Sequence, residues 1–165
     1  MAALKAGTAA PEVVLPLLGG GEFRLSDVRK SGPVLLAFFK ISCPVCQMAL
    51  PYIERIFQGT HGKGLAIVGV SQDSAANSAA FAEKFGITFP IALDDTERYP
   101  VSNAYGLTNV PTLFLVNEAG KIELTSVGWS RADVQHVTGV AAARHQGAKL
   151  VVFLPGEQVP DFKGG

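Results

Sequence analysis

The chain has 165 residues, of which 48% are hydrophobic and 17% are charged. This composition is typical of one domain with a sizeable core and excludes a disordered chain. The 14 basic side chains equal the 14 acidic ones in number, so the sequence indicates neither a nucleic-acid partner nor an anionic membrane surface. Its longest apolar stretches are far shorter than a membrane span.

The first seven residues carry no cationic segment followed by a long apolar one, so no secretory signal is predicted. As written, the sequence therefore predicts a cytoplasmic protein, and the alternative is a periplasmic protein from which a signal peptide has been removed. Thiols are mostly reduced in the cytoplasm, where a closely spaced cysteine pair is more often catalytic than structural.

The N-terminal part of the chain is rich in turns and contains two short extended pieces. Residues 13–15 and 22–25 flank the triple glycine of residues 19–21, and this arrangement predicts a β-hairpin. Residues 34–39 then form a continuous apolar run, as expected of a strand that is buried on both faces.

The chain has two cysteines, Cys43 and Cys46, and both follow this strand closely. Residues 44–57 carry apolar side chains at helical spacing, with Pro44 suited to the first turn and Pro51 expected to kink the helix. At this spacing the two sulfurs lie on one side of the helix start, close enough to bond. Unpaired backbone N–H groups at the helix start also favour a thiolate at Cys43.

Four interpretations of the cysteine pair are open at this point. A zinc site normally needs four ligands, and the chain has no second cysteine pair and only scattered histidines, so no metal is expected. A structural disulfide would close a two-residue loop and remove little entropy from the unfolded chain. An inert buried pair is the third interpretation. A redox pair that makes and breaks one disulfide best fits the strand before it and the helix after it.

The remaining sequence alternates between strands and helices. A strand is predicted over residues 65–70, a helix over 75–85 capped by Asp73 or Ser74, an extended piece over 89–93 and a short helix over 101–105. Residues 113–117 and 121–126 are expected to pair as a hairpin before a helix over 131–146.

These elements predict an α/β domain over residues 1–150, in which helices flank a central mixed β-sheet. Residues 151–165 hold a candidate edge strand at 151–154 and a tail rich in proline and glycine.

Several short motifs occur along the chain in a fixed order. They are Gly7 with Pro11, Leu25-Ser26-Asp27, Cys43-Pro44-Val45-Cys46, Val68-Gly69-Val70-Ser71, Asp94, Tyr105-Gly106-Leu107, Val110-Pro111-Thr112, Phe114-Leu115-Val116-Asn117 and Gly120-Lys121-Ile122. Together they resemble the thioredoxin-fold redoxins, the thiol-disulfide oxidoreductases related to TlpA and ResA and to the AhpC/TSA peroxiredoxins, over residues 7–146. The resemblance implies a thioredoxin-like fold with an N-terminal β-hairpin extension, and a cis Val110–Pro111 bond that faces the cysteines.

The resemblance also implies a thiol-disulfide oxidoreductase of cell redox homeostasis that needs no cofactor. Cys43 would attack a disulfide and Cys46 would resolve the mixed disulfide. Val110, Pro111 and Pro44 would hold the substrate chain. The implied partners are protein or small-molecule disulfides and thiols and an upstream thiol reductant, and the protein is expected to be a monomer or a weak dimer.

Three positions depart from the family pattern. Ser42 replaces a tryptophan, Ala37 replaces a buried aspartate, and Ala49 replaces the glutamate that accepts a proton from the second thiol. Lys40 is the nearest charged side chain in the sequence and is the candidate for tuning the pKa of Cys43, with a solvent-directed side chain as the equal alternative.

Two other functions are weighed against the oxidoreductase. One is a peroxiredoxin-like peroxidase, with Cys43 peroxidatic and Cys46 resolving. Lys40 and Leu36 stand where such enzymes need threonine and proline, so its peroxide-activating residues look incomplete. The other is a binding module built on a redoxin scaffold, and the intact cysteine pair argues against it.

Overall fold

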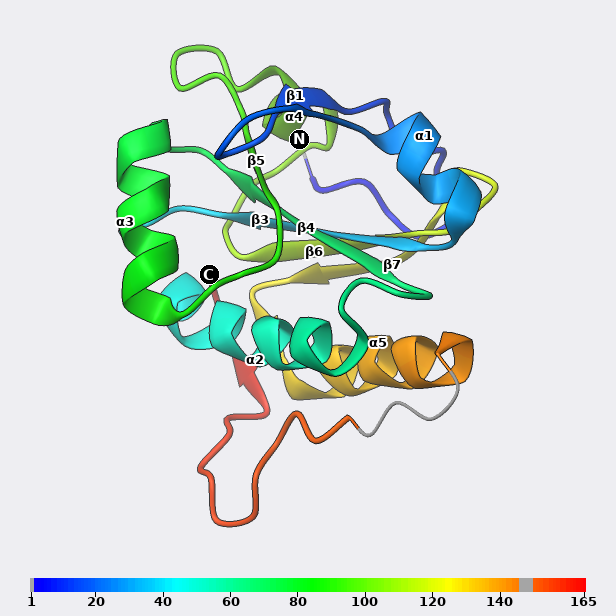
Figure 1. The fold of residues 1–165 in the computed structure, drawn as a ribbon, viewed down its shortest axis with the longest axis vertical. Coiled ribbons are helices and arrows are strands. Elements are labelled where there is room, and N and C mark those ends of the chain that lie inside the picture. The colour runs from blue at the N-terminus through cyan, green and yellow to red at the C-terminus, as the bar shows by residue number, and fades with distance from the viewer. Residues whose placement is uncertain (1, 146–149) are drawn as a thin grey trace.

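A five-stranded mixed sheet forms the centre of the molecule in a computed structural model that describes residues 2–145 and 150–165 (Figure 1). The strand order is β5-β4-β3-β6-β7. The strands are β3 (Val34–Phe39), β4 (Ala66–Ser71), β5 (Ile91–Leu93), β6 (Thr112–Val116) and β7 (Ile122–Val127). β3, β4 and β5 run parallel, whereas β6 is antiparallel to both β3 and β7. The thioredoxin-like fold with a mixed sheet is confirmed.

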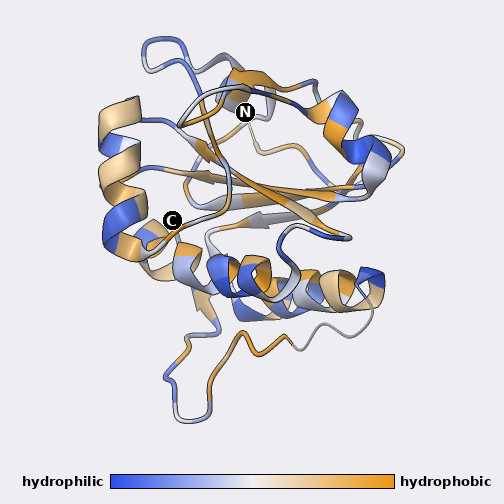
Figure 2. Cartoon of the chain, viewed as in Figure 1, coloured by the Kyte–Doolittle hydropathy of each residue, from blue (hydrophilic) through white to orange (hydrophobic). Residues whose placement is uncertain are grey.

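The central strand β3 is buried along its whole length. Successive side chains of a strand point to opposite faces, so β3 contributes to two cores. Leu35 and Phe39 belong to one cluster of buried side chains, and Leu36 and Phe38 belong to the other. Figure 2 shows hydrophobic residues concentrated on the central strands. This two-sided burial explains why the strand is a continuous apolar run rather than an alternating one.

Helices cover one face of the sheet. They are α2 (Pro44–Thr60), α3 (Ala75–Phe85) and α5 (Arg131–Arg144), and Ile53, Phe81 and Val137 place one side chain from each in the same buried cluster. The N-terminal segment and a short helix cover the opposite face. This layer comprises β1 (Val14–Pro16), β2 (Glu22–Arg24), α1 (Leu25–Val28), the 3₁₀ turn η1 (Arg29–Ser31) and α4 (Pro100–Ala104).

Most element boundaries agree with the sequence predictions to within a few residues. β1 and β2 pair as the predicted hairpin, with Leu15 opposite Phe23. α2 continues beyond residue 57 to Thr60 and ends at the left-handed His61. α5 ends at Arg144, and residue 146, the predicted end, lies outside the described residues. None of the helices in the described part of the chain combines the length and the apolar character needed to cross a bilayer.

The predicted edge strand at residues 151–154 is wrong. Val152 is buried in the helical layer and Phe153 packs against the rings of Tyr52 and Trp129, so this apolar run covers helix α2 rather than extending the sheet. The strand of the tail lies further on, where β9 (Phe162–Lys163) pairs antiparallel with β8 (Trp129–Ser130).

Candidate active site

Cys43 is the N-cap residue of α2 and is half-buried. Its backbone is extended, and its Sγ accepts a hydrogen bond from the Cys46 N–H at 3.2 Å. Pro44 follows at the first helical position, where its missing N–H leaves no helical bond unmade, and it is exposed. The helix start therefore presents the Cys43 sulfur at the surface, next to backbone N–H groups that stabilise negative charge.

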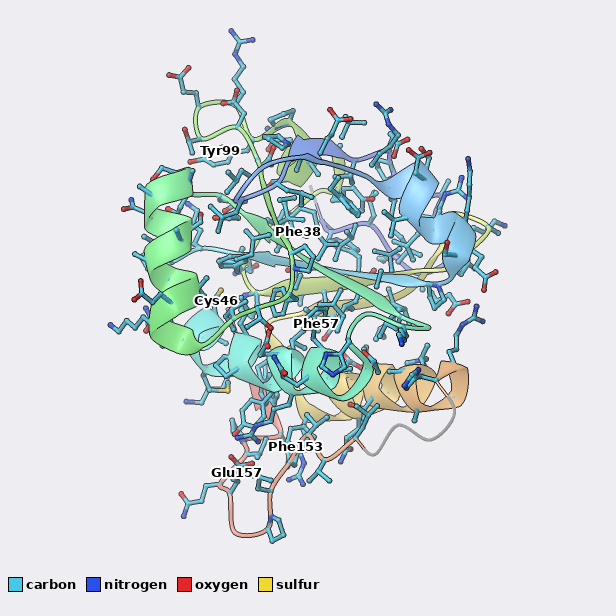
Figure 3. The ribbon with its side chains drawn as sticks, viewed as in Figure 1. Phe38, Cys46, Phe57, Tyr99, Phe153 and Glu157 are labelled. Atoms are coloured by element: carbon cyan, nitrogen blue, oxygen red, sulfur yellow. The ribbon has the colours of Figure 1, made fainter. Side chains whose placement is uncertain are left out.

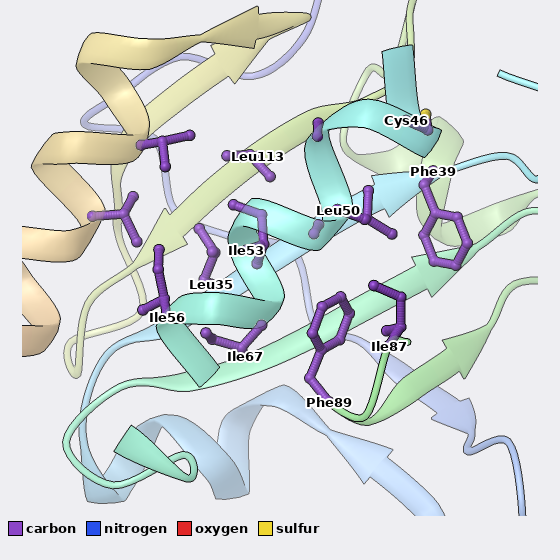
Figure 4. Close-up of a cluster of buried hydrophobic side chains, with 14 of the residues drawn as sticks. Leu35, Phe39, Cys46, Leu50, Ile53, Ile56, Ile67, Ile87, Phe89 and Leu113 are labelled. Carbon is purple, nitrogen blue, oxygen red and sulfur yellow. The ribbon is translucent and has the colours of Figure 1, made fainter. Parts of the chain in front are cut away.

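Cys46 lies one helical turn further along and is fully buried (Figure 4). It joins the cluster that includes Phe39 and Leu50. Burial raises the pKa of the Cys46 thiol well above its usual range, and its hydrogen bond with Cys43 raises the pKa further. Both cysteines are free thiols in this structure. The pair is chemically unequal, with one accessible sulfur and one buried sulfur whose thiol has a raised pKa.

The Val110–Pro111 peptide bond is cis and lies beside the cysteines, as the resemblance implies. The Cys43 thiol donates to the carbonyl oxygen of Val110 at 3.4 Å, and Pro111 is buried directly before β6. The structure thus brings Cys43, Cys46, Val110 and Pro111 together at one end of the sheet.

Two polar side chains support the turn that precedes Cys43, and the sequence did not assign either of them to the site. The Asp73 carboxylate accepts from the Ile41 N–H at 2.8 Å, and the Gln47 amide donates to the Ile41 carbonyl at 2.9 Å. Asp73 was predicted as a possible helix cap, but Ser74 caps α3 instead. Because β3 and β4 are parallel, their following turns meet at one edge of the sheet, and this relation is the signal that could have found Asp73.

The Lys40 side chain lines a hollow of about 270 Å³. Its Nζ is 5.7 Å from the centre of the Tyr99 ring. Gln72, Asn103 and Val110 line the same hollow. The Lys40 ammonium group therefore lies at this hollow, between α4 and the loop that carries the cis Val110–Pro111 bond. We call this loop the cis-proline loop.

Three of the positions that depart from the family patterns, 36, 37 and 49, are occupied by small or apolar side chains. Ala37 and Ala49 are buried, so neither place where the resemblance puts a carboxyl group carries one. Leu36 is fully buried within β3 on the opposite face from α2. No polar group from positions 36, 37 or 49 therefore acts on the sulfurs.

Comparisons with known proteins agree with this geometry. The AhpC/TSA family matches residues 6–125. The thiol-disulfide oxidoreductase ResA of Geobacillus thermodenitrificans is 36% identical over 141 residues, which cover 84% of this chain and 79% of the relative. ResA of Bacillus subtilis is 32% identical over 131 residues, covering 79% of this chain and 72% of the relative.

Solved structures show the same fold. A putative thiol:disulfide interchange protein DsbE from Chlorobium tepidum superposes with a TM-score of 0.73 at 28% identity, over 86% of this chain and 98% of that one. The peroxidoxin BcpB from Mycobacterium tuberculosis gives a TM-score of 0.72 at 21% identity, over 87% of this chain and 99% of that one. The second likeness concerns the fold alone.

Proposed function

The chain belongs to the AhpC/TSA family and is a ResA-like thiol-disulfide oxidoreductase, and from this premise we propose that Cys43 and Cys46 cycle between a dithiol and a disulfide through a mixed disulfide with the substrate. The observation that carries the proposal is the inequality of the two sulfurs. Cys43 is half-buried at a helix start, whereas Cys46 is fully buried behind it. Attack by the accessible thiolate and resolution by the deeper thiol follow from this arrangement.

Reduction of the substrate takes two thiol-disulfide exchanges. The Cys43 thiolate attacks one sulfur of a substrate disulfide, the substrate S–S bond breaks, and the released sulfur takes up a proton. Cys46 then loses its proton and attacks the Cys43 sulfur, which frees the second substrate thiol and forms the Cys43–Cys46 disulfide. The substrate gains two electrons, and an upstream thiol reductant returns two electrons to the enzyme.

The position of the cis-proline loop beside Cys43 supports the proposal that this loop holds the substrate chain. The Val110 carbonyl lies 3.4 Å from the Cys43 sulfur, so an extended chain that pairs with the loop backbone would bring its own sulfur beside Cys43. On the other side of Cys43, the exposed Pro44 at the start of α2 offers a second surface for the substrate chain. Backbone pairing of this kind suits protein disulfides, with Val110 and Pro111 as positioning residues.

The function is tested by comparing two reactions of the same protein. We expect the wild type to catalyse reduction of insulin disulfides by dithiothreitol, and to consume hydrogen peroxide no faster than dithiothreitol alone. Cys43→Ser should abolish insulin reduction, while Ser42→Ala, a matched change at the exposed neighbour, should retain it. Rapid oxidation of Cys43 by peroxide with little insulin reduction would instead establish the peroxidase.

A further inference from the structure

The last ten residues of the chain return to the active site. We call residues 156–165 the strap; they run from the loop below α2 towards the start of that helix (Figure 1). Within the strap, Phe162 pairs with Ser130 and Lys163 pairs with Trp129. The strap therefore adds a short antiparallel strand beside the end of β7.

Three polar contacts fix the path of the strap. Glu157, labelled in Figure 3, lies on the strap. Arg55 on α2 forms a two-pronged ion pair with it, at 2.7 and 2.8 Å. These hydrogen bonds from Arg55 lower the pKa of the Glu157 carboxyl to about 2, so the pair stays charged under ordinary conditions. The buried Trp129 indole donates to the Pro160 carbonyl at 2.6 Å, and the Arg131 backbone N–H donates to the Asp161 backbone carbonyl at 2.9 Å.

The end of the strap lies against the cis-proline loop. The Asn109 amide donates to the Gly165 carbonyl at 3.2 Å. A Cβ atom on Gly165 would clash with the Val110 carbonyl oxygen, the same oxygen that accepts from the Cys43 thiol. The backbone of the strap thus occupies the edge of the loop that the proposed function gives to the substrate chain.

Stability alone does not account for the placement of this end. Residues 161–165 are all exposed, and the Phe162 side chain is 65% exposed, so the end of the strap buries little apolar area. Its contacts are made by backbone atoms, as in a peptide that pairs with a strand edge. Gly128 leaves room for it, because a Cβ there would come within 2.5 Å of the Lys163 carbonyl oxygen.

We propose that the strap is an intramolecular competitor of the substrate chain: it lies between β8 and the Val110 carbonyl and must detach before a polypeptide disulfide pairs there. The inference rests on the proposed function, since it uses the same loop edge. The contact at Gly165 also indicates which chain can pair at this loop edge: an extended one with no side chain where it crosses the Val110 carbonyl. Small disulfides with no polypeptide to pair need not displace the strap.

Two neighbouring glycines provide a matched test. In Gly165→Ala the new methyl group meets the Val110 carbonyl, whereas a Cβ on Gly164 has nothing within 4 Å. If the strap is closed about nine-tenths of the time, releasing it raises kcat/KM for insulin by up to about tenfold. We expect a rise of about threefold or more in Gly165→Ala and values near the wild type in Gly164→Ala.

A small aromatic disulfide, dithiobis(nitrobenzoate), separates the possible outcomes. Its rate of reduction should be the same in wild type, Gly165→Ala and Gly164→Ala. Equal insulin kinetics in all three proteins, with insulin reduction intact, would overturn the strap proposal and leave the proposed function standing. A wild type that reduces neither disulfide would overturn the proposed function itself.

Discussion

At the residue scale, the site depends on two cysteines of the same chemistry in different surroundings. Helix α2 places the Cys43 sulfur at its N-terminus, where the Cys46 N–H donates to it. The same helix carries Cys46 into the core, where burial raises the pKa of its thiol. Because the buried Ala37 and Ala49 supply no carboxyl group, removal of the Cys46 proton is expected to limit the second exchange.

This expectation gives a pH dependence for resolution of the mixed disulfide. Only the thiolate of Cys46 attacks, and a raised pKa keeps the thiolate scarce throughout the neutral range. The single-turnover rate of resolution should therefore rise about tenfold per pH unit between about pH 6 and pH 9. Quenched-flow mass spectrometry of a preformed adduct on Cys43 measures this rate.

The control for that experiment is the same adduct on Cys46→Ser, which should persist at every pH in the absence of added thiol. A wild-type rate that levels off below pH 8 would contradict the account, because the Cys46 thiolate would then be abundant near neutrality.

At the element scale, one buried acid joins α2 to the segment before β5. The Glu54 side chain lies on the buried side of α2, where it accepts from the Thr88 and Phe89 N–H groups at 2.8 and 3.1 Å. The periodicity of α2 predicted an apolar buried face and gave no reason to place an acid there. Its role follows only from the segment that packs beside it.

Removal of this acid is predicted to destabilise the fold. Glu54→Ala leaves the Thr88 and Phe89 N–H groups without their acceptor, and lost hydrogen bonds to a charged group should lower the free energy of unfolding by about 3 kcal/mol. Urea unfolding measures the change. Glu83→Ala, a matched change at an exposed position on α3, should alter it by less than about 0.5 kcal/mol. Equal effects of the two substitutions would refute the role of Glu54.

Local patterns predicted the elements but not the identity of every partner. The apolar run of β3 and the helical spacing of α2 each determine one element, because period and burial are written within a few neighbouring residues. Residues 151–154 are equally apolar, yet they cover Tyr52 and Trp129 instead of forming a strand. A short apolar run does not distinguish a sheet edge from a helix surface as its partner.

At the scale of the whole molecule, the topology gathers the site at one end of the sheet. β3 leads into the turn before Cys43, β4 leads into Asp73, and the cis-proline loop leads into β6 next to β3. The family resemblance that these ordered motifs carry was enough to predict that Val110 lies beside Cys43, and the topology explains why it does. The strap was not predictable in this way, because Arg55 and Glu157 are 102 residues apart and no local pattern links them.

Covalent trapping of a substrate tests the central claim most directly. Each single variant, Cys46→Ser and Cys43→Ser, is incubated with a polypeptide disulfide and analysed by intact-protein mass spectrometry. We predict that Cys46→Ser accumulates one substrate chain per molecule, linked through Cys43, and that Cys43→Ser accumulates none. Adducts of equal yield on the two variants, or an adduct only on Cys46, would contradict the assignment of Cys43 as the attacking thiol.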